Sequence, residues 1–303
     1  MSEHKLYPLL FKPIIKKMVW GSELWALSGL NRDTSIVENG FLAGNDINEL
    51  MEVYLMDLVG MKTFSTSGVE FPLIVKYLTV NEFLSVQVHP DDEQAKSLHN
   101  AYGKTEVWYI TNAGPDARLY LGFNKNISPE EFLERCENQT LPDVMNCIVP
   151  QKGSCYFIPA GLIHACGGGL SITEIQEVSD ITYRIYDWGR EHDPATAREM
   201  HLDLAMDCID FNQYDPTPVT EGTLASCPYF TVKLVTVEKS LECEGITRDG
   251  FVVYAALDDP FSIIFSGVTY RVEPQRCIMI PEAVDEWVIV PGNKATMLLE
   301  VTI

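Results

Sequence analysis

Short β-rich runs separated by turn residues recur along most of the chain, and they limit the folds open to it. The runs are rich in Val, Ile, Tyr, Phe and Thr, and Gly, Pro, Asn or Asp stands between them. Many short strands with regular turn signals are typical of an all-β sandwich or barrel. We expect strands at 71–80, 84–88, 106–111, 118–121, 155–158, 171–178 and 181–186, and again at 229–236, 250–256, 261–265, 268–272, 277–280, 287–290 and 296–301.

A few short stretches favour helices instead. Residues 91–99 follow Pro90 and begin with acidic side chains, which suit the N-terminal end of a helix. Residues 128–135 begin with a Ser cap followed by Pro at the first helical position. Residues 193–199 repeat that arrangement with Asp and Pro, so the pattern predicts a third short helix there.

The length of 303 residues allows one large domain or two modest ones. Residues 212–218 hold two prolines among polar residues and are the best linker candidate. We therefore expect a domain at 1–211 and a smaller β domain at 212–303. The spacing Gly153-(x)5-Pro159-x-Gly161-x-x-His164 returns as Gln275-(x)5-Pro281-x-Ala283-x-x-Glu286, which suggests a duplicated fold whose second copy lacks the histidine.

Charge and composition exclude several classes of partner. The net charge of −21 disfavours nucleic acid and anionic membranes. No apolar run approaches the roughly 18–20 residues that cross a bilayer, and the first residues lack a signal-peptide pattern, so we expect a cytoplasmic protein. The eight cysteines form no Cys-x-x-Cys pair and are expected to be reduced thiols rather than zinc ligands.

Four residues offer a first coordination shell for a divalent metal. Gln87 and His89 stand two apart, so both point to one face of a strand while Val88 points outward. Glu106 begins an apolar run, and His164 follows a Pro-x-Gly turn near the start of the next strand. Two imidazoles, a carboxylate and an amide oxygen suit a borderline cation such as Zn²⁺. The remaining histidines stand in no such context and are expected to be ordinary hydrogen-bonded residues: His4, His99, His192 and His201.

These motifs resemble those of known families. The glycine-proline-histidine motif ending at His164 is similar to the second conserved motif of cupins. The run 87–92, together with Gly103-Lys104-Thr105-Glu106-Val107-Trp108-Tyr109, resembles the signature of type I mannose-6-phosphate isomerases (phosphomannose isomerases). The similarity extends to Ser179–Asp187 and to Trp20-Gly21, and it covers roughly residues 13–190. The chain departs from the family in lacking a sizeable helical insertion and in carrying Gly168 where an Asn is expected.

The resemblance implies an all-β fold of two cupin-like β-barrel (jelly-roll) domains, of which the first is catalytic and the second has no metal site. It implies one Zn²⁺ per chain, held by Gln87, His89, Glu106 and His164, and the interconversion of mannose 6-phosphate and fructose 6-phosphate. The partner is then a small-molecule sugar phosphate, and the protein is expected to be a monomer or a homodimer. The active-site residues that the resemblance adds are Arg184, Asp180, Lys76 and Lys104.

The three cations explain how a chain of such negative charge could hold an anionic sugar. Arg184 carries a planar fork suited to phosphate or enediolate oxygens, and Lys76 and Lys104 supply further positive charge. The general base stays open among a metal-bound water, a lysine and Asp180. Two other classes compete with the isomerase: a non-haem iron oxygenase, which also uses two His and a carboxylate, and a sugar-binding or regulatory cupin without catalysis.

Overall fold

The computed structural model describes residues 5–245 and 250–303, so His4 lies outside the described residues. The chain forms two compact units. The first takes residues 1–15, 24–76 and 221–303, and the second takes 16–23 and 77–220. Whether 1–211 and 212–303 act as separate functional domains stays a prediction. None of the described helices is long and apolar enough to span a membrane.

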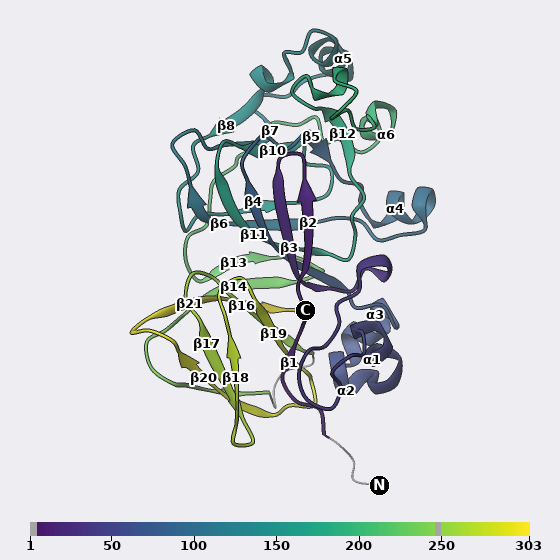
Figure 1. The fold of residues 1–303 in the computed structure, drawn as a ribbon. Coiled ribbons are helices and arrows are strands. Elements are labelled where there is room, and N and C mark those ends of the chain that lie inside the picture. Colours follow the sequence, from purple (N-terminus) through teal and green to yellow (C-terminus); the bar gives the residue numbers. More distant parts are fainter. Residues whose placement is uncertain (1–4, 246–249) are drawn as a thin grey trace. The chain divides into compact units, whose positions relative to one another are not determined.

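The second unit is built on two antiparallel sheets (Figure 1). The five-stranded sheet has the order β12 (Tyr183–Tyr186), β5 (Val86–Val88), β10 (His164–Gly167), β7 (Arg118–Phe123) and β8 (Met145–Ile148). The six-stranded sheet has the order β2 (Ile14–Met18), β3 (Gly21–Ser28), β4 (Leu73–Val80), β11 (Leu170–Glu177), β6 (Glu106–Ala113) and β9 (Cys155–Ile158). Strands β2, β3 and β4 contain residues of both units. The predicted all-β fold is confirmed.

Two hydrophobic clusters hold this unit together. One joins the facing sides of the two sheets, with Trp108 from β6, Leu121 from β7 and Ile172 from β11 all at most 1% exposed. The other covers the opposite face of the five-stranded sheet with α5 (Pro129–Glu137) and α6 (Leu202–Met206). Val88 belongs to this second cluster. It points out of the barrel as predicted, but it is buried there under the helical layer.

The first unit holds a second pair of antiparallel sheets. One has the order β1 (Leu9–Leu10), β19 (Cys277–Ile280), β16 (Val252–Ala256), β21 (Thr296–Thr302), β14 (Thr231–Val237) and β13 (Thr223–Ser226). The other has the order β15 (Leu241–Glu244), β20 (Glu286–Pro291), β17 (Phe261–Phe265) and β18 (Val268–Val272). A buried cluster that includes Tyr254, Phe261 and Ile289 lies between their strands.

The spacing repeat found in the sequence has the same local structure in both units. Gly153 (φ 90°) and Gln275 (φ 60°) each take a left-handed conformation two residues before a strand, β9 and β19 respectively. His164 is the first residue of β10, and Glu286 is the first residue of β20. His164 and Glu286 therefore occupy equivalent positions at the start of a strand. Only the second unit has a histidine there.

The helices differ most from the prediction. Helices α4 (Asp92–His99) and α5 form as expected, but the helix at 193–199 is wrong. There the backbone closes only a turn on Asp193, and Arg198 then turns to the Asp187 carboxylate, which it meets with two hydrogen bonds. A 3-10 turn, η3 (Arg190–His192), precedes it, and two more such turns lie at η1 (Asn31–Asp33) and η2 (Leu141–Val144).

Four helices were not predicted: α6 and, earlier in the chain, α1 (Ile47–Tyr54), α2 (Met56–Val59) and α3 (Met61–Ser67). Helix α1 begins with a capping box, in which the Asp46 side chain accepts backbone N–H groups while Glu49 bonds back to Asp46. An Asp followed three residues later by Glu is a readable start signal. The two helices that follow are short, and each ends at a glycine with positive φ.

Candidate metal centre

Strand pairing places three polar residues in one row across the five-stranded sheet. His164 on β10 pairs directly with Gln87 on β5, and Gln87 pairs on its other side with Arg184 on β12. Directly opposed residues of antiparallel strands share a face of the sheet. His89 follows β5 two residues after Gln87, so these four side chains all belong to the face turned toward the barrel interior.

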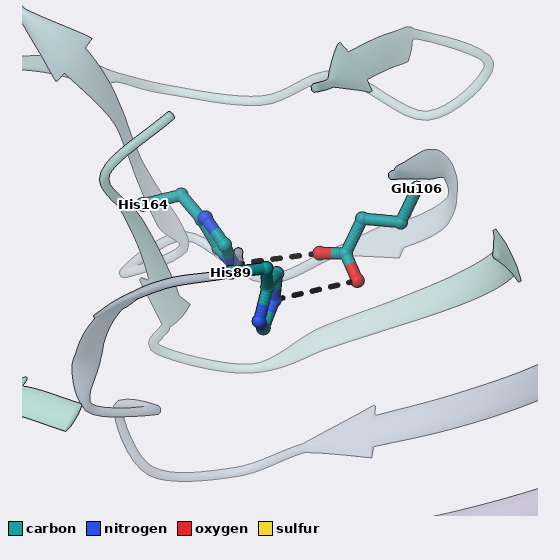
Figure 2. Close-up of side chains that lie close together, drawn as sticks. All are labelled: His89, Glu106 and His164. Carbon is teal, nitrogen blue, oxygen red and sulfur yellow. Dashed lines mark ion pairs between the residues drawn. The ribbon is translucent and has the colours of Figure 1, made fainter. Parts of the chain in front are cut away.

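Figure 2 shows His89, His164 and Glu106 turned toward one another. His164 Nε2 lies 3.4 Å from Glu106 Oε1, and His89 Nε2 lies 3.7 Å from Glu106 Oε2. The two imidazole rings are 4.8 Å apart between centroids. All three side chains are at most 1% exposed, and one ligand atom from each lies within 4.8 Å of the others.

Backbone carbonyl groups determine which ring nitrogen of each histidine faces the centre. His164 Nδ1 is 2.8 Å from the Leu162 carbonyl oxygen, and His89 Nδ1 is 2.9 Å from that of Ile181. A carbonyl only accepts, so each Nδ1 carries the proton and each Nε2 presents its lone pair. Burial lowers the pKa of His164 to about 4, which keeps this ring neutral at physiological pH.

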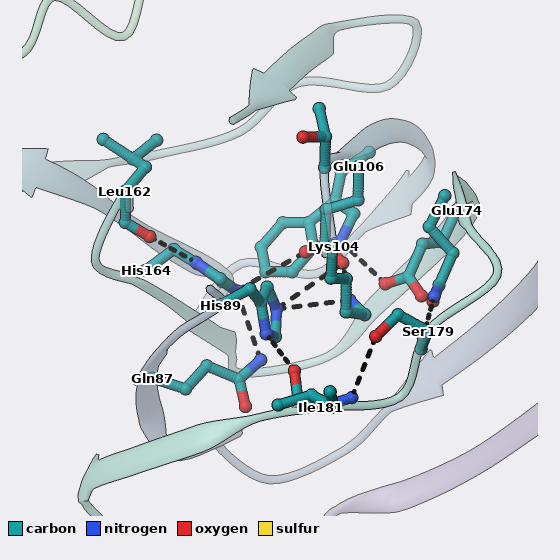
Figure 3. A network of polar contacts seen from close by, with 12 residues as sticks. Gln87, His89, Lys104, Glu106, Leu162, His164, Glu174, Ser179 and Ile181 are labelled. Atoms are coloured by element: carbon teal, nitrogen blue, oxygen red, sulfur yellow. Dashed lines mark hydrogen bonds and ion pairs between the residues drawn. The ribbon is translucent and has the colours of Figure 1, made fainter. Parts of the chain in front are cut away.

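These three groups fit a divalent cation. Two imidazole lone pairs and a carboxylate are all acceptors, and acceptors buried at such distances repel unless a positive charge lies among them. Glu106 Oε1 accepts no hydrogen bond from the described residues. In the structure the positive charge comes from Lys104, whose Nζ donates to Glu106 Oε2 and lies 3.2 Å from His89 Nε2 (Figure 3). The donor set of two nitrogens and a carboxylate is one that binds Zn²⁺.

Gln87 completes the predicted ligand set at the edge of this group. Its amide nitrogen is 3.2 Å from His164 Nε2, and its Oε1 lies 3.5 Å from Ser85 Oγ. Turning the amide about its terminal torsion exchanges the oxygen and the nitrogen without moving the chain. Gln87 can therefore donate to the His164 lone pair, as it does in the structure, or present its oxygen to a cation.

The other predicted residues, Arg184, Asp180 and Lys76, lie on different parts of the chain and have different partners. Arg184 is held beside Gln87: its Nε is 3.2 Å from Ser85 Oγ and its Nη1 is 2.6 Å from the Glu199 carbonyl oxygen. Asp180 is partly exposed on the turn before β12, next to the Ile181 carbonyl that orients His89. Lys76 is buried on β4 in the first unit, with its ammonium 4.8 Å from the centroid of the Trp25 ring.

Two buried carboxylates near the centre were missed from the sequence. Glu174 Oε2 accepts from Trp108 Nε1 at 2.9 Å, and the Trp108 ring stands edge-on to His164. Glu177 Oε2 accepts the Thr105 N–H at 2.7 Å, and burial with the nearby Asp92 charge raises the pKa of Glu177 to about 7. The available signal was the presence of acidic and amide residues inside the otherwise apolar strand β11. A strand of this kind is expected to be buried, so its polar residues are expected to be buried with it.

Comparisons with known proteins show which family and fold the chain resembles. The family model described as the catalytic domain of type I phosphomannose isomerase matches residues 7–115. A probable mannose-6-phosphate isomerase of Bacillus subtilis, GmuF, is 35% identical over 233 residues, which are 71% of this chain and 72% of the relative. The crystal structure of a mannose 6-phosphate isomerase from Bacillus subtilis has the same fold, with a TM-score of 0.86, 24% identity and coverage of 98% of this chain and 100% of its own.

A second solved structure has the same fold. It is a mannose 6-phosphate isomerase in a zinc-bound holo form, with a TM-score of 0.76, 12% identity and coverage of 98% of this chain and 99% of its own. Its identity is low enough that the likeness concerns the fold alone. The identity and coverage of GmuF, with the matching family model, decide the family. The chain belongs to the type I mannose-6-phosphate isomerases (phosphomannose isomerases).

Proposed function

We propose that this chain is a zinc-dependent aldose–ketose isomerase that interconverts mannose 6-phosphate and fructose 6-phosphate through an enediol(ate). The observation that carries the proposal is the convergence of two imidazole lone pairs and a buried carboxylate beside Lys104, in a chain of this family. The substrate is a small-molecule sugar phosphate. A cytoplasmic location and a monomeric or homodimeric state stay predictions.

The ligands proposed for one Zn²⁺ per chain are Gln87, His89, Glu106 and His164. Both histidines already present the nitrogen that a metal needs, because backbone carbonyls hold their other nitrogen as a donor. When bound, the metal supplies Lewis-acid polarisation of the sugar carbonyl. Three of its four ligands are neutral, so the bound site keeps a net positive charge that favours the developing enediolate.

Arg184 is the proposed contact for the anionic oxygens of the substrate. Its Nε and Nη1 are taken by Ser85 and Glu199, while its Nη2 donates no hydrogen bond to any described residue. Burial and the charges of Arg198 and Arg190 lower the pKa of Arg184, while the carboxylates of Asp187 and Glu199 act in the opposite direction. Arg190 and Arg198 both bond to the Asp187 carboxylate. The three guanidinium groups thus exceed by one charge the two carboxylates that act on Arg184, which favours an anion at this part of an acidic protein.

Proton transfer between C1 and C2 needs a group at the reaction centre that can hold a proton. Lys104 is buried against Glu106 and His89, and its Nζ donates to the Glu106 carboxylate, so a proton can be held at this point of the centre. Asp180 lies on the neighbouring turn, and Lys76 is a further buried cation. We assign Lys104 and Asp180 to proton handling, while a role for Lys76 in charge support stays a prediction. The general base is left open among a lysine, Asp180 and water.

The proposal is tested by incubating the purified protein with mannose 6-phosphate in deuterated water and following the sugar by NMR. Fructose 6-phosphate should appear with deuterium at C1, and the remaining mannose 6-phosphate should gain deuterium at C2, because an enediol exchanges its proton with solvent. Unphosphorylated mannose serves as the control and should react far more slowly, since it lacks the group that Arg184 binds. No conversion by the zinc-loaded protein would contradict the proposal.

A further inference from the structure

His201 and Arg184 are joined by two reciprocal hydrogen bonds. The His201 backbone N–H donates to the Arg184 carbonyl oxygen at 2.8 Å, and the Arg184 backbone N–H donates to His201 Nδ1 at 3.2 Å. Strand β12 is the outer strand of its sheet, so its outward backbone groups have no further strand to pair with. At Arg184 the His201 imidazole accepts the backbone N–H that would otherwise pair with a neighbouring strand.

The same segment also holds the Arg184 side chain. The carbonyl oxygen of Glu199, two residues before His201, accepts from Arg184 Nη1 at 2.6 Å. Ser85 Oγ takes the guanidinium on its other side, at Nε. Residues 199–201 therefore contact Arg184 both at its backbone and at its guanidinium.

The bond to His201 needs one particular state of the imidazole. Nδ1 can accept the Arg184 N–H only with a free lone pair, so the proton of the neutral ring lies on Nε2, which is 3.8 Å from Glu199 Oε2. Burial and the Arg184 charge lower the pKa of His201, in agreement with a neutral ring. Sequence alone gave this histidine no such role.

We propose that His201 is a positioning residue for the isomerase, which holds Arg184 in the place from which it contacts the anionic substrate. The inference rests on the proposed function. It does not make His201 a contact of the substrate or of the metal, since its bonds run to the backbone of β12. Loss of Nδ1 should therefore weaken substrate use while leaving the metal ligands loaded.

Three variants separate this role from a general structural one. His201→Ala should lower kcat/KM for mannose 6-phosphate about tenfold, mainly through KM, with zinc content unchanged. His201→Asn should restore most of this loss, because its Oδ1 can stand where Nδ1 accepts. His201→Gln places its polar atoms at the Nε2 position instead and should not restore it. His192→Ala, at an exposed histidine on the same connection, should change nothing.

The results distinguish a failure of the proposed function from a failure of the inference about His201. If wild-type protein has no isomerase activity, the proposed function fails; if it is active and His201→Ala matches it, the inference about His201 fails. Equal losses in the Asn and Gln variants would also overturn the inference. If the Ala variant does not fold, ¹⁵N NMR of the wild-type imidazole provides the second test: at neutral pH the His201 signals should show an unprotonated Nδ1. A protonated Nδ1 would overturn the proposal.

Discussion

His164 lies directly across from Gln87 in the pairing of β10 with β5, and the Gln87 amide nitrogen is 3.2 Å from His164 Nε2. The imidazole lone pair that we assign to a metal is thus already engaged by a weak, neutral donor. Such a bond costs little to break, because rotating the amide replaces the nitrogen with an oxygen that can itself bind a cation. The pair is prepared for the metal without a change in the backbone.

The proposed ligands Glu106 and Gln87 should differ in how much each contributes to metal affinity. Glu106→Gln removes the only anionic ligand of the four and should lower zinc affinity by more than about 100-fold, beyond the usual loss for an outer partner of a metal site. Gln87→Ala removes a neutral ligand and should cost about ten- to a hundredfold. Metal content after dialysis against graded zinc buffers measures both, and isomerase activity should fall in step with it.

Glu131→Gln is the matched control, because Glu131 lies on helix α5, away from the proposed ligands, and pairs with Lys125 and Arg135. It should keep full metal content. The ranking is wrong if Gln87→Ala loses more zinc than Glu106→Gln.

Arg184 should matter for turnover and not for the metal. Arg184→Ala removes a guanidinium that has two of its nitrogens held by Ser85 and Glu199 and is not a ligand of the proposed metal. We expect kcat/KM for mannose 6-phosphate to fall roughly a hundredfold or more, as for other lost charge-stabilising donors, with zinc content unchanged. Steady-state kinetics with metal analysis on the same sample checks both. Arg135→Ala on α5 is the control, and full activity of Arg184→Ala would refute the assigned role.

His164 should make the metal-free protein less stable in acid. Its folded-state pKa is about 4 and its ordinary value is 6.5, so between these values the unfolded chain binds a proton that the folded chain does not. The free energy of unfolding should therefore fall as pH drops from 6.5 to 4, by about 3 kcal/mol from this residue, and should be level above 6.5. Urea unfolding across this range measures the slope. His164→Gln lacks the group and should show a smaller slope; an equal slope would count against the buried neutral ring.

Glu177 should make the protein less stable as pH rises, which is opposite to the effect of His164. Its folded-state pKa is raised to about 7 from 4.5, so the folded chain keeps a proton that the unfolded chain loses as pH rises between these values. Stability from this residue is present below pH 4.5 and lost by pH 7. Glu177→Gln keeps an oxygen for the Thr105 N–H without the buried charge. It should be more stable than wild type at pH 8, by about 2–3 kcal/mol, and similar to it at pH 4.5.

Urea unfolding of both proteins at the two pH values tests this directly. A Glu177→Gln protein less stable than wild type at pH 8 would mean that the ionised carboxylate is held by the Lys104 charge rather than penalised by burial.

The strands and the metal cluster could be predicted because their signals are local. Alternation across Gln87, Val88 and His89 gives the side-chain directions, and the turn before His164 gives the start of β10. The barrel fold then follows from the number of short strands. The functional weight of the His–Glu–His cluster came from its motif spacing, which survives in a single sequence.

The remaining parts depend on contacts between residues distant in the chain. The helix expected at 193–199 failed because Arg198 bonds to Asp187, a tertiary interaction that outweighs a favourable cap at Asp193. His201 reads as an ordinary histidine until β12 is placed beside it. Glu177 likewise gains its role only when β11 is paired with β6, which brings its carboxylate to Thr105.

Zinc dependence of the reaction is tested by measuring the isomerase activity of the wild-type protein before chelation, after chelation and after metal is returned. We predict that interconversion of mannose 6-phosphate and fructose 6-phosphate falls in proportion to the zinc removed. It should return when one zinc ion per chain is added back, and Mg²⁺ should not replace zinc at a site with two imidazole ligands. Full activity in protein shown by metal analysis to be zinc-free would refute a zinc-dependent isomerase.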